Sequence, residues 1–168
     1  MPAFDYEVNG LPLHILVVHA VVVFVPLAAV SVLLAAAWPA ARRRLGLLPA
    51  ALATVALALV PVTTAAGEWL KARLPSAPLI EQHAALGDDL LPWSIAVFVV
   101  AVLLWLYDRF RPRLAERMPP GVVRAVPWVL LVLAFAAAVG SLITVVVIGE
   151  SGARAVWQGT YSPDPLPR

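Results

Sequence analysis

Four long apolar runs constrain the fold of this chain more than any other feature of its sequence. They cover about residues 11–38, 47–67, 79–108 and 122–149, and the third is most apolar over residues 90–107. A helix needs roughly 17–25 mostly apolar residues to cross a bilayer, because each residue advances it by about 1.5 Å. The runs therefore predict an all-α protein, an integral membrane bundle of four helices. The connections are short, so consecutive helices should be antiparallel neighbours in an up-and-down bundle.

The composition excludes a soluble domain. Apolar residues make up 62% of the chain and charged residues 13%, whereas soluble domains average roughly 45–50% and about 25%. Disorder is excluded as well, because too much apolar surface would lie in water. The chain has no cysteine, which removes disulfides, thiolate metal sites, iron–sulfur ligation and c-type haem attachment. We expect one transmembrane domain over residues 1–168, with an irregular tail at 158–168 because three prolines lie in its last eight residues.

The charged residues predict the orientation of the helices. One side of the bundle carries eight basic and two acidic residues, and the other side carries four basic and eight acidic residues. Loops rich in Lys and Arg stay on the cytoplasmic side. We therefore expect a multi-pass protein of the inner (plasma) membrane with both termini on the outer side. The basic residues of the inner side are Arg42, Arg43, Arg44, Arg109, Arg111, Arg113, Arg117 and Arg124.

All three histidines lie toward the outer end of the predicted bundle. Counted from the aromatic residues that end the first and third runs, His14 and His83 are each 24 residues away, so they share a level. His19 and Asp88 are each 19 residues away, about 7–8 Å deeper. Glu68 ends the second run near the upper level. Ionisable groups at such depth are costly and usually mark function.

Haem b is the first cofactor that this cluster fits. The first and third helices lie diagonally in an up-and-down bundle, roughly 11–14 Å apart, which suits two histidines that reach one iron. The simplest axial pair is His14 and His83, and His19 would then hydrogen-bond a propionate or a ligand. Lys71 or Arg73 would neutralise propionates. This interpretation predicts an electron-transfer protein whose partner is a quinone or an external electron carrier.

Two other interpretations stay open. A copper or zinc ion could be held by His14, His19 and His83, with Glu68 and Asp88 as further or alternative ligands. However, His14 and His19 lie five residues apart, about 140° around a helix, so both cannot face one small ligand squarely. The bundle could also be a cofactor-free structural or assembly subunit whose histidines meet water. A hydrolase is disfavoured because Gly-x-Ser-x-Gly and His-Glu-x-x-His motifs are absent from the sequence, as are nucleic-acid motifs.

Four short motifs resemble a family of bacterial membrane proteins known as "domain of unknown function 2231". They are Gly10-Leu11-Pro12-Leu13-His14 followed by Val18-His19, Thr63-Thr-Ala-Ala-Gly-Glu-Trp69, Glu81-Gln82-His83-Ala84, and Gly149-Glu-Ser-Gly152. The resemblance covers about residues 10–157 and implies a four-helix membrane domain with histidines at one end. Relatives joined to Rieske-type or cytochrome-c-like domains imply electron transfer. Ile15 departs from the proline that often follows the first histidine.

Overall fold

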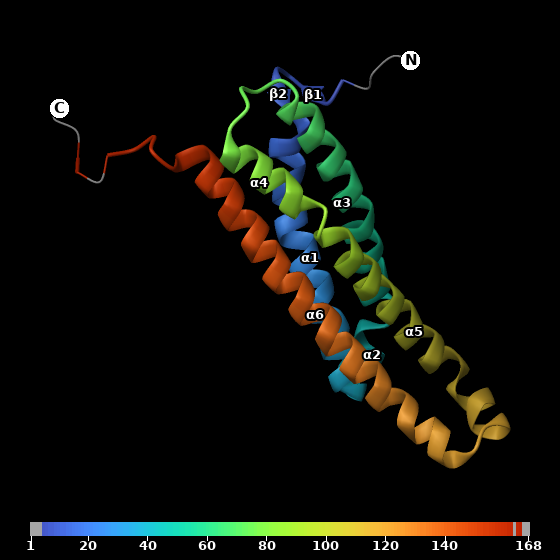
Figure 1. Cartoon of the computed structure of the whole chain (residues 1–168). Helices are drawn as coiled ribbons and strands as arrows, with labels where there is room; N and C mark the ends of the chain where they lie inside the picture. The colour runs from blue at the N-terminus through green and yellow to red at the C-terminus, as the bar shows by residue number, and fades with distance from the viewer. Residues whose placement is uncertain (1–4, 163, 166–168) are drawn as a thin grey trace.

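The apolar runs form long helices that lie side by side in one elongated bundle (Figure 1). The protein is described from a computed structural model, which covers residues 5–162 and 164–165. Within these residues, the four long helices are α1 (Leu13–Ala37), α3 (Leu48–Lys71), α5 (Leu90–Arg117) and α6 (Pro120–Trp157). Two shorter helices are α2 (Pro39–Leu45) and α4 (Pro78–Gly87). A small antiparallel hairpin of β1 (Glu7–Val8) and β2 (Leu11–Pro12) precedes α1.

The order of the helices confirms the up-and-down bundle. Helix α1 packs against α3 and α6, and α5 packs against the same two helices, so α1 and α5 lie across the bundle from each other. The candidate membrane spans in the described residues are Leu13–Ala37, Leu48–Lys71, Pro78–Arg117 and Pro120–Trp157. All four are long and apolar enough to cross a bilayer. The chain is therefore an all-α, multi-pass membrane protein.

The third run differs from the continuous helix that we expected over residues 79–108. It is divided into α4 and α5, with Asp88 and Asp89 between them. Pro92 lies in the first turn of α5, and a proline cannot donate the helical hydrogen bond to the residue four positions earlier and clashes with its carbonyl. That residue is Asp88, so a continuous helix fails there. As a result, α4 packs on α6 and α3 and can take its own direction.

The other helix bounds also differ from the sequence-based ones. Residues 11 and 12 form β2, so α1 begins at Leu13, and α3 continues to Lys71. Helix α6 begins at Pro120 and runs to Trp157, well beyond residue 149; an ion pair between Glu150 and Arg154 supports the added turns. Helix α2 was not expected. The tail contains no helix in its described part, and residues 163 and 166–168 lie outside it.

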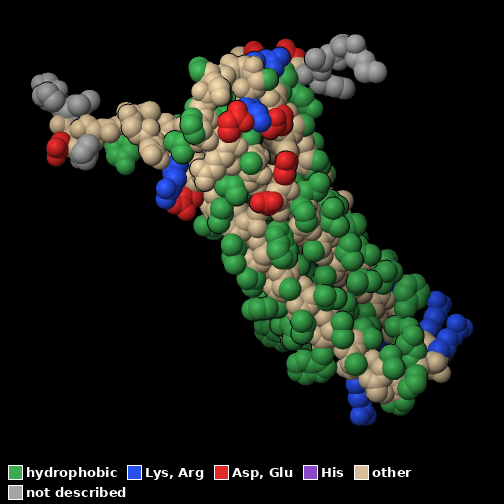
Figure 2. Space-filling model, viewed as in Figure 1, with side chains coloured by type: hydrophobic (Ala, Val, Ile, Leu, Met, Phe, Trp, Pro, Cys, Tyr) green, Lys and Arg blue, Asp and Glu red, His purple; other side chains and the backbone are tan. Residues whose placement is uncertain are grey.

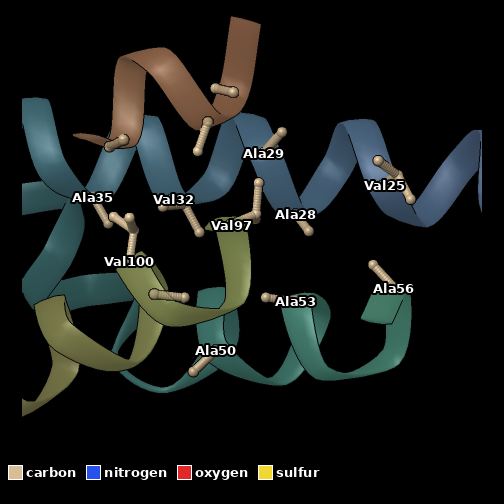
Figure 3. Packing of buried hydrophobic residues seen from close by; sticks show 14 of the residues in the cluster. Val25, Ala28, Ala29, Val32, Ala35, Ala50, Ala53, Ala56, Val97 and Val100 are labelled. Carbon is tan, nitrogen blue, oxygen red and sulfur yellow. The ribbon is translucent and has the colours of Figure 1, made fainter. Parts of the chain in front are cut away.

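Small side chains fill the middle of the bundle. Its core is mostly alanine and valine, and Figure 3 shows such residues of α1, α3 and α5 directed toward one another. Buried hydroxyls mostly bond to their own helix: Ser31 donates to the Ala28 carbonyl, and Ser141 donates to the Ala137 carbonyl. Small residues allow helices in a membrane to approach closely. The core therefore supplies a uniform apolar frame, and polar chemistry is left to the two ends.

The two ends of the bundle carry different charged groups, separated by an apolar belt (Figure 2). One end, which we call the basic end, contains α2, the last turns of α5 and the first turns of α6. There Arg42 forms an ion pair with Asp108, with 3.0 Å between Nε and Oδ2. The opposite end, which we call the histidine end, contains the β-hairpin, α4, the last turns of α3 and the last turns of α6. This division follows the charge pattern of the sequence.

Candidate functional site

Two of the three histidines meet at the histidine end. The ring centroids of His14, on α1, and His83, on α4, lie 6.1 Å apart with an angle of 78° between the ring planes. Both side chains belong to partly buried residues. Helix α4 contributes its histidine because the break before α5 lets it lie against α6 and α3. We call His14 and His83 the histidine pair.

A backbone carbonyl fixes the tautomer of His14. Its Nδ1 lies 3.0 Å from the carbonyl oxygen of Thr63, on α3. A carbonyl only accepts hydrogen bonds, and its two lone pairs allow it to serve a second donor besides its helical one. The neutral imidazole therefore carries its proton on Nδ1, which leaves the lone pair of Nε2 free to bind a ligand.

A serine fixes the tautomer of His83 in the same sense. The Nδ1 atom of His83 lies 3.0 Å from Oγ of Ser151, on α6. The Ser151 hydroxyl donates its own proton to the carbonyl of Ile148, at 2.8 Å, so its oxygen must accept the bond from His83. Nδ1 therefore carries the proton in this ring too, and the lone pair of Nε2 is again free.

A glycine lies against each ring of the pair. A Cβ added to Gly67 would lie 3.0 Å from Nδ1 of His14, and one added to Gly152 would lie 3.0 Å from Cε1 of His83. Gly67 follows Thr63 by one helical turn, so both lie on the face of α3 that His14 contacts. Because each glycine lacks a side chain, its helix backbone can approach the imidazole closely enough for the hydrogen bond beside it.

The structure places His19 away from the pair. Its side chain is exposed on the outside of α1, and its Nδ1 lies 2.6 Å from the carbonyl oxygen of Ile15 in its own helix. The separation of five residues accounts for this position, since it turns His19 about 140° away from His14. Of the three histidines that the sequence singled out, two are brought together and one is not.

The acidic and basic candidates near the pair have other partners. Glu68 lies 3.1 Å from Nζ of Lys71, and the same ammonium lies 3.5 Å from Glu81 on α4. Arg73 stacks over the Trp69 ring, with 3.7 Å between its guanidinium carbon and the ring centroid. These contacts tie the end of α3 to α4 and occupy the cations that the haem interpretation assigned to propionates.

Asp88 lines a hollow on α3 and α5 and makes none of the hydrogen bonds of the histidine pair. This open hollow, of about 440 Å³, is lined by Pro61, Thr64 and Ala65 of α3 and by Asp88 and Leu91. In the part of the chain that the structure describes, no group of three or more His, Cys, Asp or Glu side chains is arranged to hold one metal ion. The histidine pair is therefore a site with two donors.

The residues that orient the pair were not among the sequence candidates. Thr63, Gly67, Ser151 and Gly152 carry no titratable group, so a search for ionisable side chains passes over them. Their signal is present in the motifs Thr63–Trp69 and Gly149–Gly152. The four motifs of the resemblance come from α1, α3, α4 and α6, and each contributes at least one residue to the histidine pair or its contacts, whereas His19 of the first motif lies away from it.

Comparison with known proteins identifies the family of the chain. A family model described as "Predicted membrane protein (DUF2231)" matches residues 10–162, which include every residue of the site. No curated protein and no solved structure matches the chain. The match spans all four long helices, and on that basis the chain belongs to the DUF2231 family of predicted membrane proteins.

Proposed function

We propose that this protein is an electron-transfer-type membrane protein in which His14 and His83 bind one redox-active metal centre through their Nε2 atoms. The observation that carries the proposal is the pair of fixed tautomers: each Nδ1–H is held by an acceptor on a different helix. Metal-binding histidines typically donate the other ring N–H to a carbonyl or similar group, which orients the ring and raises its basicity. Both members of the pair have this arrangement.

The number of donors favours the iron of haem b. A structural zinc site needs four protein ligands and a catalytic one needs three, whereas the described residues offer a group of only two. Haem iron needs only axial ligands from the protein, because the porphyrin supplies the other four. The cysteine-free sequence excludes covalent c-type attachment. The donor set therefore fits haem b, which would supply one-electron transfer.

A single copper ion is the second candidate. Two imidazoles that bind one ion at metal–nitrogen distances of about 2.0–2.1 Å must have their ring centroids close to each other. The observed separation is 6.1 Å. Imidazole suits copper as it suits iron. In this form His14 and His83 would hold the ion through Nε2, and copper would supply one-electron transfer.

The position of the pair supports a metal centre on the outer side of the membrane. The pair lies at the end of the bundle that is poor in arginine, and loops rich in Lys and Arg stay on the cytoplasmic side. We therefore place the protein in the plasma membrane with the histidine end outward. A metal centre at the histidine end would be within reach of a quinone in the bilayer or of an external electron carrier. The residues of the pair hold and orient the centre, and the surrounding helices exclude water.

The test is an absorption spectrum of the detergent-purified protein after haem-replete expression, oxidised and then reduced with dithionite, with elemental analysis of the same sample. Three variants are compared: His14→Ala, His83→Ala and, as the matched control, His19→Ala. For haem b we expect a Soret band and sharp reduced bands that both pair variants lose and the control keeps. For copper we expect no haem bands but one copper per chain, with the same dependence on the variants.

Two outcomes would contradict the proposal. A colourless, metal-free protein after expression with both haem and copper would leave only a structural or assembly subunit. Equal loss of the centre in His19→Ala would mean that the exposed histidine is a ligand, against the geometry of α1. A thermal unfolding curve of each variant shows whether a lost band reflects a lost ligand or an unfolded chain.

A further inference from the structure

A second polar site lies at the basic end, far from the histidine pair. It is a pocket of about 280 Å³ between the end of α1, α2, the start of α3 and the last turns of α5. Its polar side is formed by Arg42, Arg43, Asp108 and Arg109, and Trp105 contributes to its apolar side. Three arginines against one aspartate give the pocket an excess of positive charge.

Arg42 carries the argument, because it is buried and incompletely paired. Its side chain is 10% exposed. Nε contacts Asp108, and the guanidinium carbon lies 5.9 Å from the ring centroid of Tyr107. Among the residues that the structure describes, no group accepts a hydrogen bond from the buried Nη1 atom. A buried donor without an acceptor destabilises the folded protein, and more so when the group is charged.

An oxyanion would satisfy this group. Guanidinium donors match the oxygens of phosphate and can bind two of them at once. Arg43 and Arg109 reach the same pocket from α2 and α5 and are exposed, so they can close around a bound anion. Because Asp108 is already paired with Arg42, its negative charge offsets little of the positive charge of Arg43 and Arg109.

The apolar wall of the pocket indicates where such an anion comes from. Ala35, Ala101, Leu104 and Trp105 line it, and Trp105 is 42% exposed on the surface of α5. An acyl chain could therefore run along α5 from a headgroup in the pocket. Basic pockets between helices at the cytoplasmic surface of a membrane bind acidic lipid headgroups.

We infer that the pocket binds the phosphate of an anionic phospholipid, with Arg42, Arg43 and Arg109 as its donors. This inference is independent of the metal centre, which lies at the other end of the bundle. A bound lipid would join α2 to α5 across the pocket and complete the hydrogen bonds of Arg42. The protein should then be more stable in membranes that contain anionic lipid.

The test uses the full chain in nanodiscs of phosphatidylcholine, with and without phosphatidylglycerol. Thermal unfolding is followed by tryptophan fluorescence, since the chain has six tryptophans, and bound phosphatidylglycerol is counted by native mass spectrometry. The pocket variant is Arg43→Gln with Arg109→Gln. The matched control is Arg44→Gln with Arg113→Gln, which removes the same charge from the same two helices; Arg109 and Arg113 both lie 5.7 Å from the Phe110 ring.

We expect phosphatidylglycerol to raise the Tm of the wild type and of the control, and to bind about tenfold more weakly to the pocket variant than to the control. Tenfold weaker binding corresponds to about 1.4 kcal/mol, which the loss of charged hydrogen bonds to the phosphate readily accounts for. Equal weakening in both variants would mean that only surface charge attracts the lipid and would overturn the inference. An equal rise in Tm from inorganic phosphate in phosphatidylcholine discs would overturn it too, because the site would then take a free anion.

Discussion

The two ends of the bundle are built in the same way but present opposite chemistry. At each end a short helix that begins with proline lies against the long helices, α4 with Pro78 and α2 with Pro39. Helix α4 brings His83 to a site where each Nδ1–H has an acceptor. Helix α2 brings Arg42, whose Nη1 has none among the described residues.

Because of this difference, the two ends suit different kinds of ligand. At the histidine end, hydrogen bonds from the two rings to α3 and α6 orient both rings, so the proposed binding of a metal depends on the positions of their Nε2 atoms. At the basic end, an excess of charge faces an open pocket, so binding depends on the sign of the ligand and on its oxygens. The alanine and valine core adjoins both ends and does not determine what either end binds.

The largest expected effect on stability is at the basic end. Arg42→Gln leaves Asp108 without its partner, and we expect the free energy of unfolding to fall by about 2 kcal/mol, less than for a fully buried pair because water reaches Asp108. A double-mutant cycle with Asp108→Asn, measured by chemical unfolding in mixed micelles, checks this value. If the double variant is as unstable as the sum of the single ones, the ion pair contributes nothing.

A smaller effect is expected where a glycine meets a ring at the histidine end. Gly152→Ala gains helix propensity of about 1 kcal/mol but crowds His83, and overpacking costs roughly 1–3 kcal/mol. We expect a net loss of stability of about 1 kcal/mol and a weaker metal centre. The control is Gly149→Ala on the same helix, where no described atom beyond the adjoining residues and the nearby helix backbone lies within 4 Å of the added Cβ; it should gain about 0.5–1 kcal/mol. Matching changes in the two variants would contradict the close approach of His83.

A comparison of two serines separates orientation from stability. Ser151→Ala removes the acceptor of His83 Nδ1–H, so we expect metal affinity to fall about 10–100-fold and stability by about 1 kcal/mol. Ser94 is 2% exposed, and its hydroxyl has no partner within the described chain. Ser94→Ala should therefore leave metal affinity unchanged and alter stability by less than about 0.5 kcal/mol. Metal titration of both variants would reveal whether the Ser151 bond orients the ring.

The smallest expected effect is that of His19→Ala. Its side chain is exposed and bonds within its own helix, so we expect metal content and Tm to match the wild type. Surface substitutions usually change stability by less than about 0.5 kcal/mol. Thermal unfolding and elemental analysis check this. A change as large as that of Ser151→Ala would place His19 in the function of the histidine end.

The sequence by itself determined the membrane bundle and the division of its ends. Hydropathy and length are properties of each segment alone, so they predict the spans before any packing is known. Charge counting separated the basic end from the histidine end, and residue counting placed His14 and His83 at one level. The break in the third run does not change this division of the ends, because α4 still lies beside α3 and α6.

The tertiary structure decided which side chains meet. The sequence favoured His14 and His83 by their shared level but could not establish the pair, because the pairing depends on how each helix is rotated and on the direction of α4 before the break at Asp88. The bonds that orient the pair join residues 49 and 68 positions apart, and no local pattern specifies them. The roles of Gly67 and Gly152 follow from the same contacts, because the lack of a side chain matters only where another residue packs against the glycine.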